Sequence, residues 1–144
     1  LQVSVAQEGE RVASGKVLLA PSNAHLTINA GGFVNLDQSA PIKSSRPSAT
    51  RLFESVAQTF GANSIGIILT GMGDDGVDGL VTLSQSGAYV IAQDEDSCIV
   101  FGMPKAAIER GIVDEVLSPE SIAARLIKLH RHVQTLSKLR HQSS

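Results

Sequence analysis

Hydrophobic positions follow two different periods along this chain, and the period changes near Pro47. Before Pro47, short runs alternate between apolar and polar side chains, as half-buried strands do. These runs lie at residues 3–5, 17–20, 26–28 and 33–36. Because Gly31 and Gly32 separate the last two runs, the pattern predicts a β-hairpin there.

After Pro47, helical and strand-like stretches take turns. Apolar residues recur every three or four positions over residues 52–60, which predicts a helix that ends before Gly61. Residues 64–70 are apolar on both faces, which is typical of a central parallel strand. Further segments follow as helix 77–83, strand 88–92, helix 104–110 and strand 112–117. This alternation predicts an α/β fold with a mostly parallel sheet and helices on both of its faces.

The last segment predicts one long helix. Ser118 and Pro119 form a strong start signal, because the serine side chain caps free N–H groups and proline fits the first turn. Apolar residues then recur at spacings of four and three positions. We therefore expect residues 1–120 to form one domain and residues 121–144 to form a C-terminal helix and tail. The basic end of this helix is expected to run free or to pair with another helix.

Composition excludes several classes of function. The 144 residues are 42% hydrophobic, 18% charged and 3% aromatic, with a net charge of −2. Scarce aromatics and the lack of like-charge blocks predict no nucleic-acid partner. No apolar run reaches about 18 residues, so we expect no membrane insertion. The single Cys98 fits a reducing cytoplasm.

The start of the chain also carries information. It opens at Leu1 inside an alternating strand pattern, without a basic-then-apolar leader. We therefore expect no signal peptide, and we expect an N-terminally truncated fragment that lacks the first strand and helix of its fold.

A glycine-rich loop follows the predicted central strand. Gly71, Gly73 and Gly76 have the spacing of a dinucleotide-binding fingerprint, and acids follow about 20 residues further on. A dinucleotide-binding domain is therefore one alternative. However, Asp74 and Asp75 lie inside the loop, where their charges would repel a pyrophosphate at a helix N-terminus.

Three explanations of the loop acids remain open from the residues alone. Asp74, Asp75 and Asp78 could offer oxygens to a divalent cation, although their spacing is not that of an EF-hand. A carboxylate can instead hold a catalytic histidine in one tautomer, while the glycines expose backbone N–H groups beside the chemistry. The third explanation is that the acids cap the helix starting near Gly76, and we favour it for Asp74 and Asp78.

Two long motifs carry a resemblance to a known family. The first reads IILTGMGDDGVDGL at residues 67–80, and the second reads IAQDEDSCIVFGMPKAAI at residues 91–108. Shorter landmarks lie at residues 19–25 and 46–48. In this order and at this separation, the motifs closely resemble the chemotaxis protein-glutamate methylesterase domain of the CheB type, over about residues 3–120.

The resemblance implies a Rossmann-like three-layer αβα sandwich and a serine hydrolase that uses no cofactor and no metal. Such enzymes demethylate glutamate methyl esters on the cytoplasmic helices of chemoreceptors, and they also deamidate receptor glutamines. The resemblance therefore implies a cytoplasmic protein of chemotaxis signalling. Relatives often carry a receiver domain that is controlled by phosphorylation, and others are fused to a receptor methyltransferase. Either domain is thus an implied partner within the same polypeptide.

The resemblance also assigns roles within the loop. The aspartate of the family's Ser-His-Asp triad falls on Asp75, and the backbone N–H of Met72 matches the oxyanion contact. Asp74 occupies a position where relatives often carry asparagine, so its charge is not needed for the chemistry.

The nucleophile and the base of that triad have no counterpart in this chain. The family's serine lies in a G-x-S-x-G-G turn, and Ser22, Ser48 and Ser97 lack that setting. His25 is predicted to be a structural hydrogen-bonding residue, and the histidines of the tail are predicted to face solvent. We therefore expect the chain alone to be inactive. The alternative is a non-catalytic relative that acts as a binding module.

Overall fold

The structure is a computed structural model that describes residues 1–143. Its N-terminal third contains two pairs of short strands. β1 (Gln2–Val5) and β2 (Lys16–Leu19) pair in parallel, whereas β3 (His25–Ile28) and β4 (Val34–Asp37) form an antiparallel hairpin. The hairpin confirms the prediction from the Gly-Gly turn, in which Gly32 has a φ of +80°.

Helices and strands alternate after the hairpin, as the change of period predicts. The elements are α1 (Ala49–Thr59), η1 (Gly61–Asn63), β5 (Ile65–Ile68), α2 (Val77–Gln85), β6 (Tyr89–Gln93), α3 (Met103–Glu109), β7 (Glu115–Leu117) and α4 (Pro119–Gln142). Strands β5, β6 and β7 form a parallel sheet with β6 in the middle. The predicted α/β architecture with a mostly parallel sheet is confirmed.

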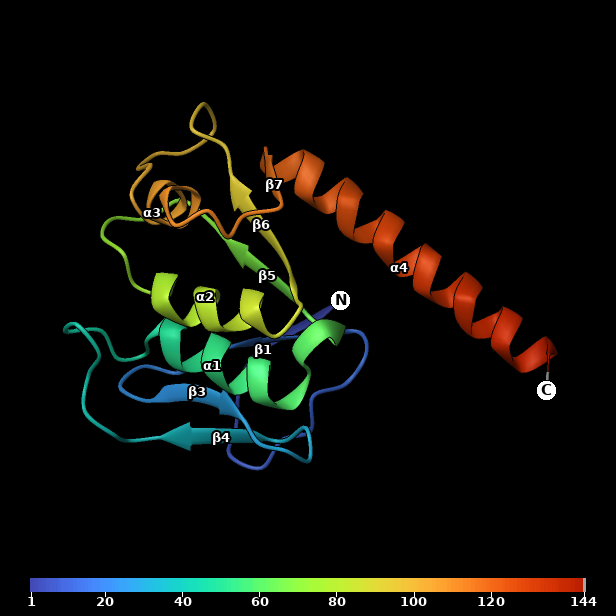
Figure 1. Ribbon diagram of the computed structural model, residues 1–144. Helices are drawn as coiled ribbons and strands as arrows, with labels where there is room; N and C mark the ends of the chain where they lie inside the picture. The colour runs from blue at the N-terminus through green and yellow to red at the C-terminus, as the bar shows by residue number, and fades with distance from the viewer. Residues whose placement is uncertain (144) are drawn as a thin grey trace.

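The two faces of this sheet are covered by different helices. Val90 and Ala92 of β6 are fully buried and belong to the core cluster that α2 completes with Leu80 and Leu83. Successive side chains of a strand point to opposite faces of the sheet, so Tyr89 points to the face opposite Val90. There it lines a hollow together with α4 residues. Figure 1 shows α1 and α2 side by side between the β3–β4 hairpin and the sheet.

The last strand is shorter than the predicted segment 112–117. Its ladder begins only at Glu115 because the side chain of Asp114 takes the place of a backbone acceptor. The Asp114 carboxylate accepts the N–H of Val90 at 2.7 Å, while the Asp114 N–H donates to the Val90 carbonyl at 2.8 Å. Ile112 and Val113 pack against the core cluster instead.

Helix α4 starts at the predicted signal and then leaves the body of the protein (Figure 1). The Ser118 side chain accepts the N–H of Ser121, Ile122 is buried, and the residues beyond His130 are exposed. Ser144, the last residue of the predicted tail, lies outside the described residues. None of the helices in residues 1–143 is both long and apolar enough to cross a lipid bilayer.

Helices α1 and α2 touch through their backbones at one point. A Cβ atom added to Gly79 would lie 2.7 Å from the Cα atom of Thr50, a distance that real Cβ atoms do not tolerate. The position of a Cβ atom is set by its own backbone and the Thr50 atom is a backbone atom, so no side-chain rotation can relieve the clash. Gly79 is therefore required by the approach of the two helices, although glycine is a poor helix former.

Replacing Gly79 with alanine tests this contact. On helix propensity alone, Gly79→Ala would stabilise α2 by about 1 kcal/mol. We expect the opposite, a loss of about 1–3 kcal/mol in the free energy of unfolding, because the added methyl group overpacks the helix contact. Chemical denaturation of the protein that carries this chain measures it. Gln85→Ala, in the exposed last turn of α2, is the control and should stay within about 0.5 kcal/mol. A stabilised Gly79→Ala variant would contradict the packing argument.

Candidate functional site

The glycine-rich loop leaves the carboxyl end of β5 and is held by the loop that follows β6. The backbone N–H of Gly71 donates to the Val100 carbonyl at 3.0 Å, and the Gly71 carbonyl accepts the N–H groups of Gly102 and Met103. Working groups of parallel α/β folds gather at this edge of the sheet. The two motifs that are separated along the sequence therefore form one surface.

Gln93 at the end of β6 links the two loops with a single amide. Its Oε1 atom accepts the N–H of Thr70 at 2.8 Å, and its Nε2 atom donates to the carbonyl and hydroxyl oxygens of Ser97. The side chain is 4% exposed, so these bonds replace those that water would otherwise supply. This side chain also explains why the β5 ladder stops at Ile68, before the predicted end at Thr70.

The Asp75 carboxylate points to the N-terminus of α1. Its Oδ1 atom accepts the hydroxyl of Ser48 at 2.6 Å, and its Oδ2 atom accepts the backbone N–H of Ala49 at 2.9 Å. Asp75 is half-buried. A carboxylate at a helix N-terminus is stabilised by free N–H groups and by the helix dipole. Asp75 is thus oriented by a helix other than the one that its own loop begins.

His25 lies behind Ser48 and is fully buried. Its Nδ1 atom accepts the backbone N–H of Ser48 at 3.1 Å, which makes Nε2 the protonated nitrogen. Nε2–H then donates to the Ala40 carbonyl at 3.1 Å. Both ring nitrogens are therefore used by backbone groups, and the prediction of a structural role for His25 is confirmed.

Asp74 in the loop and Asp78 in the first turn of α2 do not cap this helix with their side chains, so the prediction that they do was wrong. The N-cap of α2 is Gly76, and neither acid supplies a side-chain capping bond there. Asp74 instead pairs with Lys43 at 2.8 Å, while Asp78 pairs with Arg110 at 3.0 Å and with Lys43 at 3.4 Å. These acids form long-range ion pairs instead of a local cap because Lys43 and Arg110 reach them from distant segments of the chain.

These ion pairs shift the ionisation of the groups that form them. The hydrogen bond from Arg110, and then that from Lys43, lowers the pKa of Asp78 below its ordinary value of 3.8. The carboxylates of Asp74 and Asp78 raise the pKa of Lys43 in return. All three side chains are exposed, so the pairs set local charge more than they set stability.

Met72 stands at the outer edge of the loop, where its side chain is 82% exposed. Among residues 1–143, no group accepts its backbone N–H. An oxyanion contact requires such an N–H without an acceptor inside the protein. Its role as that contact remains a prediction.

A hollow of about 270 Å³ opens beside Asp75. Its walls are mostly apolar and comprise Ala20, Leu26, Pro47, Ser48, Ala49, Leu52 and Asp75. An apolar hollow next to one carboxylate suits a flat side chain or a substrate group that donates one hydrogen bond. Within residues 1–143, no three His, Cys, Asp or Glu side chains are arranged to hold a metal ion. The contacts of the three loop acids with cations and N–H donors account for them without one.

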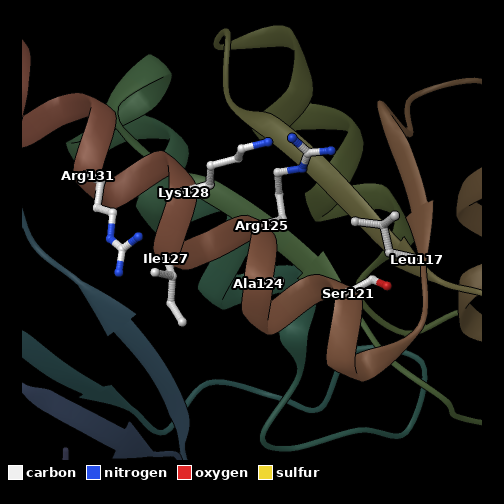
Figure 2. A pocket seen from close by; sticks show the side chains of 7 residues that line it. All are labelled: Leu117, Ser121, Ala124, Arg125, Ile127, Lys128 and Arg131. Atoms are coloured by element: carbon white, nitrogen blue, oxygen red, sulfur yellow. The ribbon is translucent and has the colours of Figure 1, made fainter.

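A larger hollow of about 410 Å³ lies along α4, away from this loop (Figure 2). Arg125, Lys128 and Arg131 project from successive turns of the helix, and Leu117 lies near Arg125. Arg125 pairs with Glu115 at 2.7 Å, which fastens α4 to β7. The lining contains no acid and no pair of groups suited to proton transfer. This hollow is therefore a weaker candidate for chemistry than the one beside Asp75.

Comparison with known proteins decides the family. The sequence profile of the family described as CheB methylesterase matches residues 1–126. The chain belongs to the CheB methylesterase family. A relative from Bdellovibrio bacteriovorus, named protein-glutamate methylesterase/protein-glutamine glutaminase, is 45% identical over 130 residues, which are 88% of this chain and 37% of that protein. A relative from Geobacter metallireducens with a similar name is 46% identical over 129 residues, covering 88% of this chain and 36% of its own length.

A solved structure extends the likeness to three dimensions. The CheB methylesterase catalytic domain of Thermotoga maritima superposes with a TM-score of 0.84 at 41% identity, covering 87% of this chain and 68% of that one. This confirms the predicted Rossmann-like αβα fold and the predicted family. It also removes the support for a dinucleotide-binding domain, since the loop glycines lie within the matched region. The chain spans little more than a third of the curated relatives it matches.

Sequence reasoning missed most of the partners of the loop. The stretch between Arg51 and Lys105 contains no Lys or Arg, so the acids looked uncompensated. Lys43 and Arg110 lie just outside that stretch and reach the acids through the fold. The only sequence signal for the Asp75 contact was the short landmark at residues 46–48.

The Asp78 ion pairs yield a prediction for pH. Because its pKa is lowered in the folded protein, the stabilisation by these pairs is present above 3.8 and is lost as the pH falls through the folded-state pKa. We expect Arg110→Gln to raise the pKa of Asp78 towards 3.8, with Lys43 keeping part of the shift. An NMR titration of the carboxyl carbons measures it. Asp37, whose pKa is lowered by Ser39, is the internal control and should not move. An unchanged Asp78 would refute the assigned cause.

Proposed function

We propose that the protein containing this chain is a protein-glutamate methylesterase in which Asp75 orients the catalytic base. One observation carries the proposal. The Asp75 carboxylate is fixed by two donors at the carboxyl end of the sheet, beside an apolar hollow. Membership of the CheB methylesterase family and the names of the relatives support it. The substrates are glutamate methyl esters on the cytoplasmic helices of chemoreceptors, and receptor glutamines are deamidated at the same site.

In this proposal, a serine and a histidine from another part of the protein complete the site. The serine hydroxyl attacks the ester carbonyl while the histidine takes its proton. Methanol leaves with that proton, and water then hydrolyses the acyl-enzyme to give glutamate and the free serine. With a glutamine substrate, ammonia leaves in place of methanol. No cofactor or metal takes part.

Asp75 accepts the second N–H of that histidine, which fixes its tautomer and stabilises the imidazolium. The hollow beside Asp75 is the place for the ring, because Leu26 and Leu52 line it with apolar side chains. The open N–H of Met72 binds the oxyanion of the tetrahedral intermediate. Hydrogen bonds of this kind are worth more when apolar walls exclude water.

The proposed setting follows from the same family membership. The protein acts in the cytoplasm, where the signalling helices of chemoreceptors are found. A receiver domain or a receptor methyltransferase in the same polypeptide would connect the esterase to its input. The chain covers only part of each matched relative, which leaves room for such a domain.

Comparing the two neighbouring acids tests the assignment of Asp75. In the complete protein, we expect Asp75→Asn to lower the rate of methanol release from methylated receptor about 10⁴-fold, because the histidine loses its orienting acceptor. Asp74→Asn is the matched control, since Asp74 bonds to Lys43 at the surface. Its turnover should remain within about threefold of the parent, as expected for loss of an exposed ion pair. Equal losses in the two variants, or none in Asp75→Asn, would refute the assignment.

The 144-residue chain by itself provides a second test. Within residues 1–143, the hydrogen bonds of Asp75 come from Ser48 and Ala49 and not from a histidine, so we expect no methanol release above background from this chain with methylated receptor. The measurement is release of radiolabelled methanol, with the complete protein as positive control. Turnover by the chain alone would show that a group within it acts as nucleophile. Lack of turnover in the complete protein would favour the alternative of a non-catalytic binding module.

A further inference from the structure

Both oxygens of Asp75 are held by the first residues of α1. The Ser48 hydroxyl lies 2.6 Å from Oδ1, and the Ala49 N–H lies 2.9 Å from Oδ2. A carboxylate offers about four lone-pair positions, so one remains on each oxygen for a further donor. Two bonds from one rigid helix end fix both the position and the rotation of the carboxyl plane.

The direction of the Ser48 bond is determined by its other contacts. Ser48 Oγ accepts the N–H of Thr50 at 3.2 Å, as an N-cap side chain does. Its single hydrogen is therefore available to Asp75, and the short distance fits a bond from a hydroxyl to a charged acceptor. Ser48 caps the helix and orients the acid with the same oxygen.

Ser48 is itself fixed from behind. Its backbone N–H donates to Nδ1 of His25, and the imidazole is anchored at its other end to the Ala40 carbonyl. His25 is 0% exposed and Ser48 is 2% exposed, so water does not compete for these bonds. A continuous path of hydrogen bonds thus runs from the buried interior to the Asp75 carboxylate.

We propose that Ser48 is a positioning residue for the esterase reaction, acting through Asp75. This inference rests on the proposed function, because it needs Asp75 to orient the base. Without the hydroxyl, Asp75 keeps only the Ala49 N–H, and its carboxyl plane can rotate about that bond. The histidine then loses its alignment with the ester. Misplacement of a catalytic group by about 1 Å costs on the order of 10²-fold in rate.

The test separates positioning from helix capping with two variants in the complete protein. Ser48→Ala removes the hydroxyl and the cap, whereas Ser48→Gly removes the hydroxyl while glycine remains a tolerated cap. We expect kcat for methylated receptor to fall about 10²-fold in both variants, with KM nearly unchanged. Ser48→Thr keeps a hydroxyl and should restore most of the turnover. A rate loss that follows thermal stability across the variants would overturn the inference.

Ser118 provides the matched control. It caps α4 as Ser48 caps α1, with its side chain accepting the N–H of Ser121, but it lies far from the loop along the chain. Ser118→Ala loses a comparable cap, and its kcat should equal that of the parent protein. A loss in Ser118→Ala equal to that in Ser48→Ala would assign the effect to folding and overturn the inference.

A double variant links the effect to Asp75. If Ser48 acts through Asp75, adding Ser48→Ala to Asp75→Asn should cause almost no further loss of kcat. A further loss of the full 10²-fold would show that Ser48 acts elsewhere and would overturn the inference. The proposed function would then still stand on the large effect of Asp75→Asn alone. Conversely, if Asp75→Asn left kcat unchanged, both the proposed function of Asp75 and the inference about Ser48 would be overturned.

Discussion

The candidate site depends on the contact between the start of α1 and the loop that leads into α2. At this contact, the backbone of Gly79 lies against Thr50, and the N–H of Gly76 donates to the Thr50 hydroxyl at 3.1 Å. A Cβ atom on Gly76 would lie 2.9 Å from that of Ala49, and its φ of +88° also favours glycine. Two glycines thus allow a helix end to reach Asp75. Any residue that moved the helices apart would remove both donors from the acid together.

Two acids of the loop and one in the first turn of α2 differ in their surroundings. Asp75 turns inward to backbone and hydroxyl donors, whereas Asp74 and Asp78 turn outward to cations. Asp74 and Asp75, which are adjacent and have the same side chain, therefore have different partners. Local sequence cannot separate them, because the separation comes from the segment that each side chain faces.

The hydrophobic period predicted the order of elements well because burial sets it over many residues. It erred where single polar side chains replaced backbone partners. The Asp114 carboxylate accepts a backbone N–H where β7 was expected to continue, and the Gln93 amide does the same beyond the end of β5. A single side chain that replaces a backbone acceptor leaves no trace in the hydrophobic period. Lys43 was missed for a related reason. It reaches Asp74 from 31 positions away in the sequence, and only the folded chain reveals that pairing.

The balance of charge around Asp75 has a consequence for how such a site can change over evolutionary time. Its negative charge is met by the end of a helix and by a neutral hydroxyl, not by a lysine or arginine. The exposed charges of the loop belong to other acids and their cations. Substitutions among these exposed acids and cations can therefore change the surface charge while the contacts of Asp75 stay in place. The exposed ion pairs and the donors to Asp75 are separate sets of atoms.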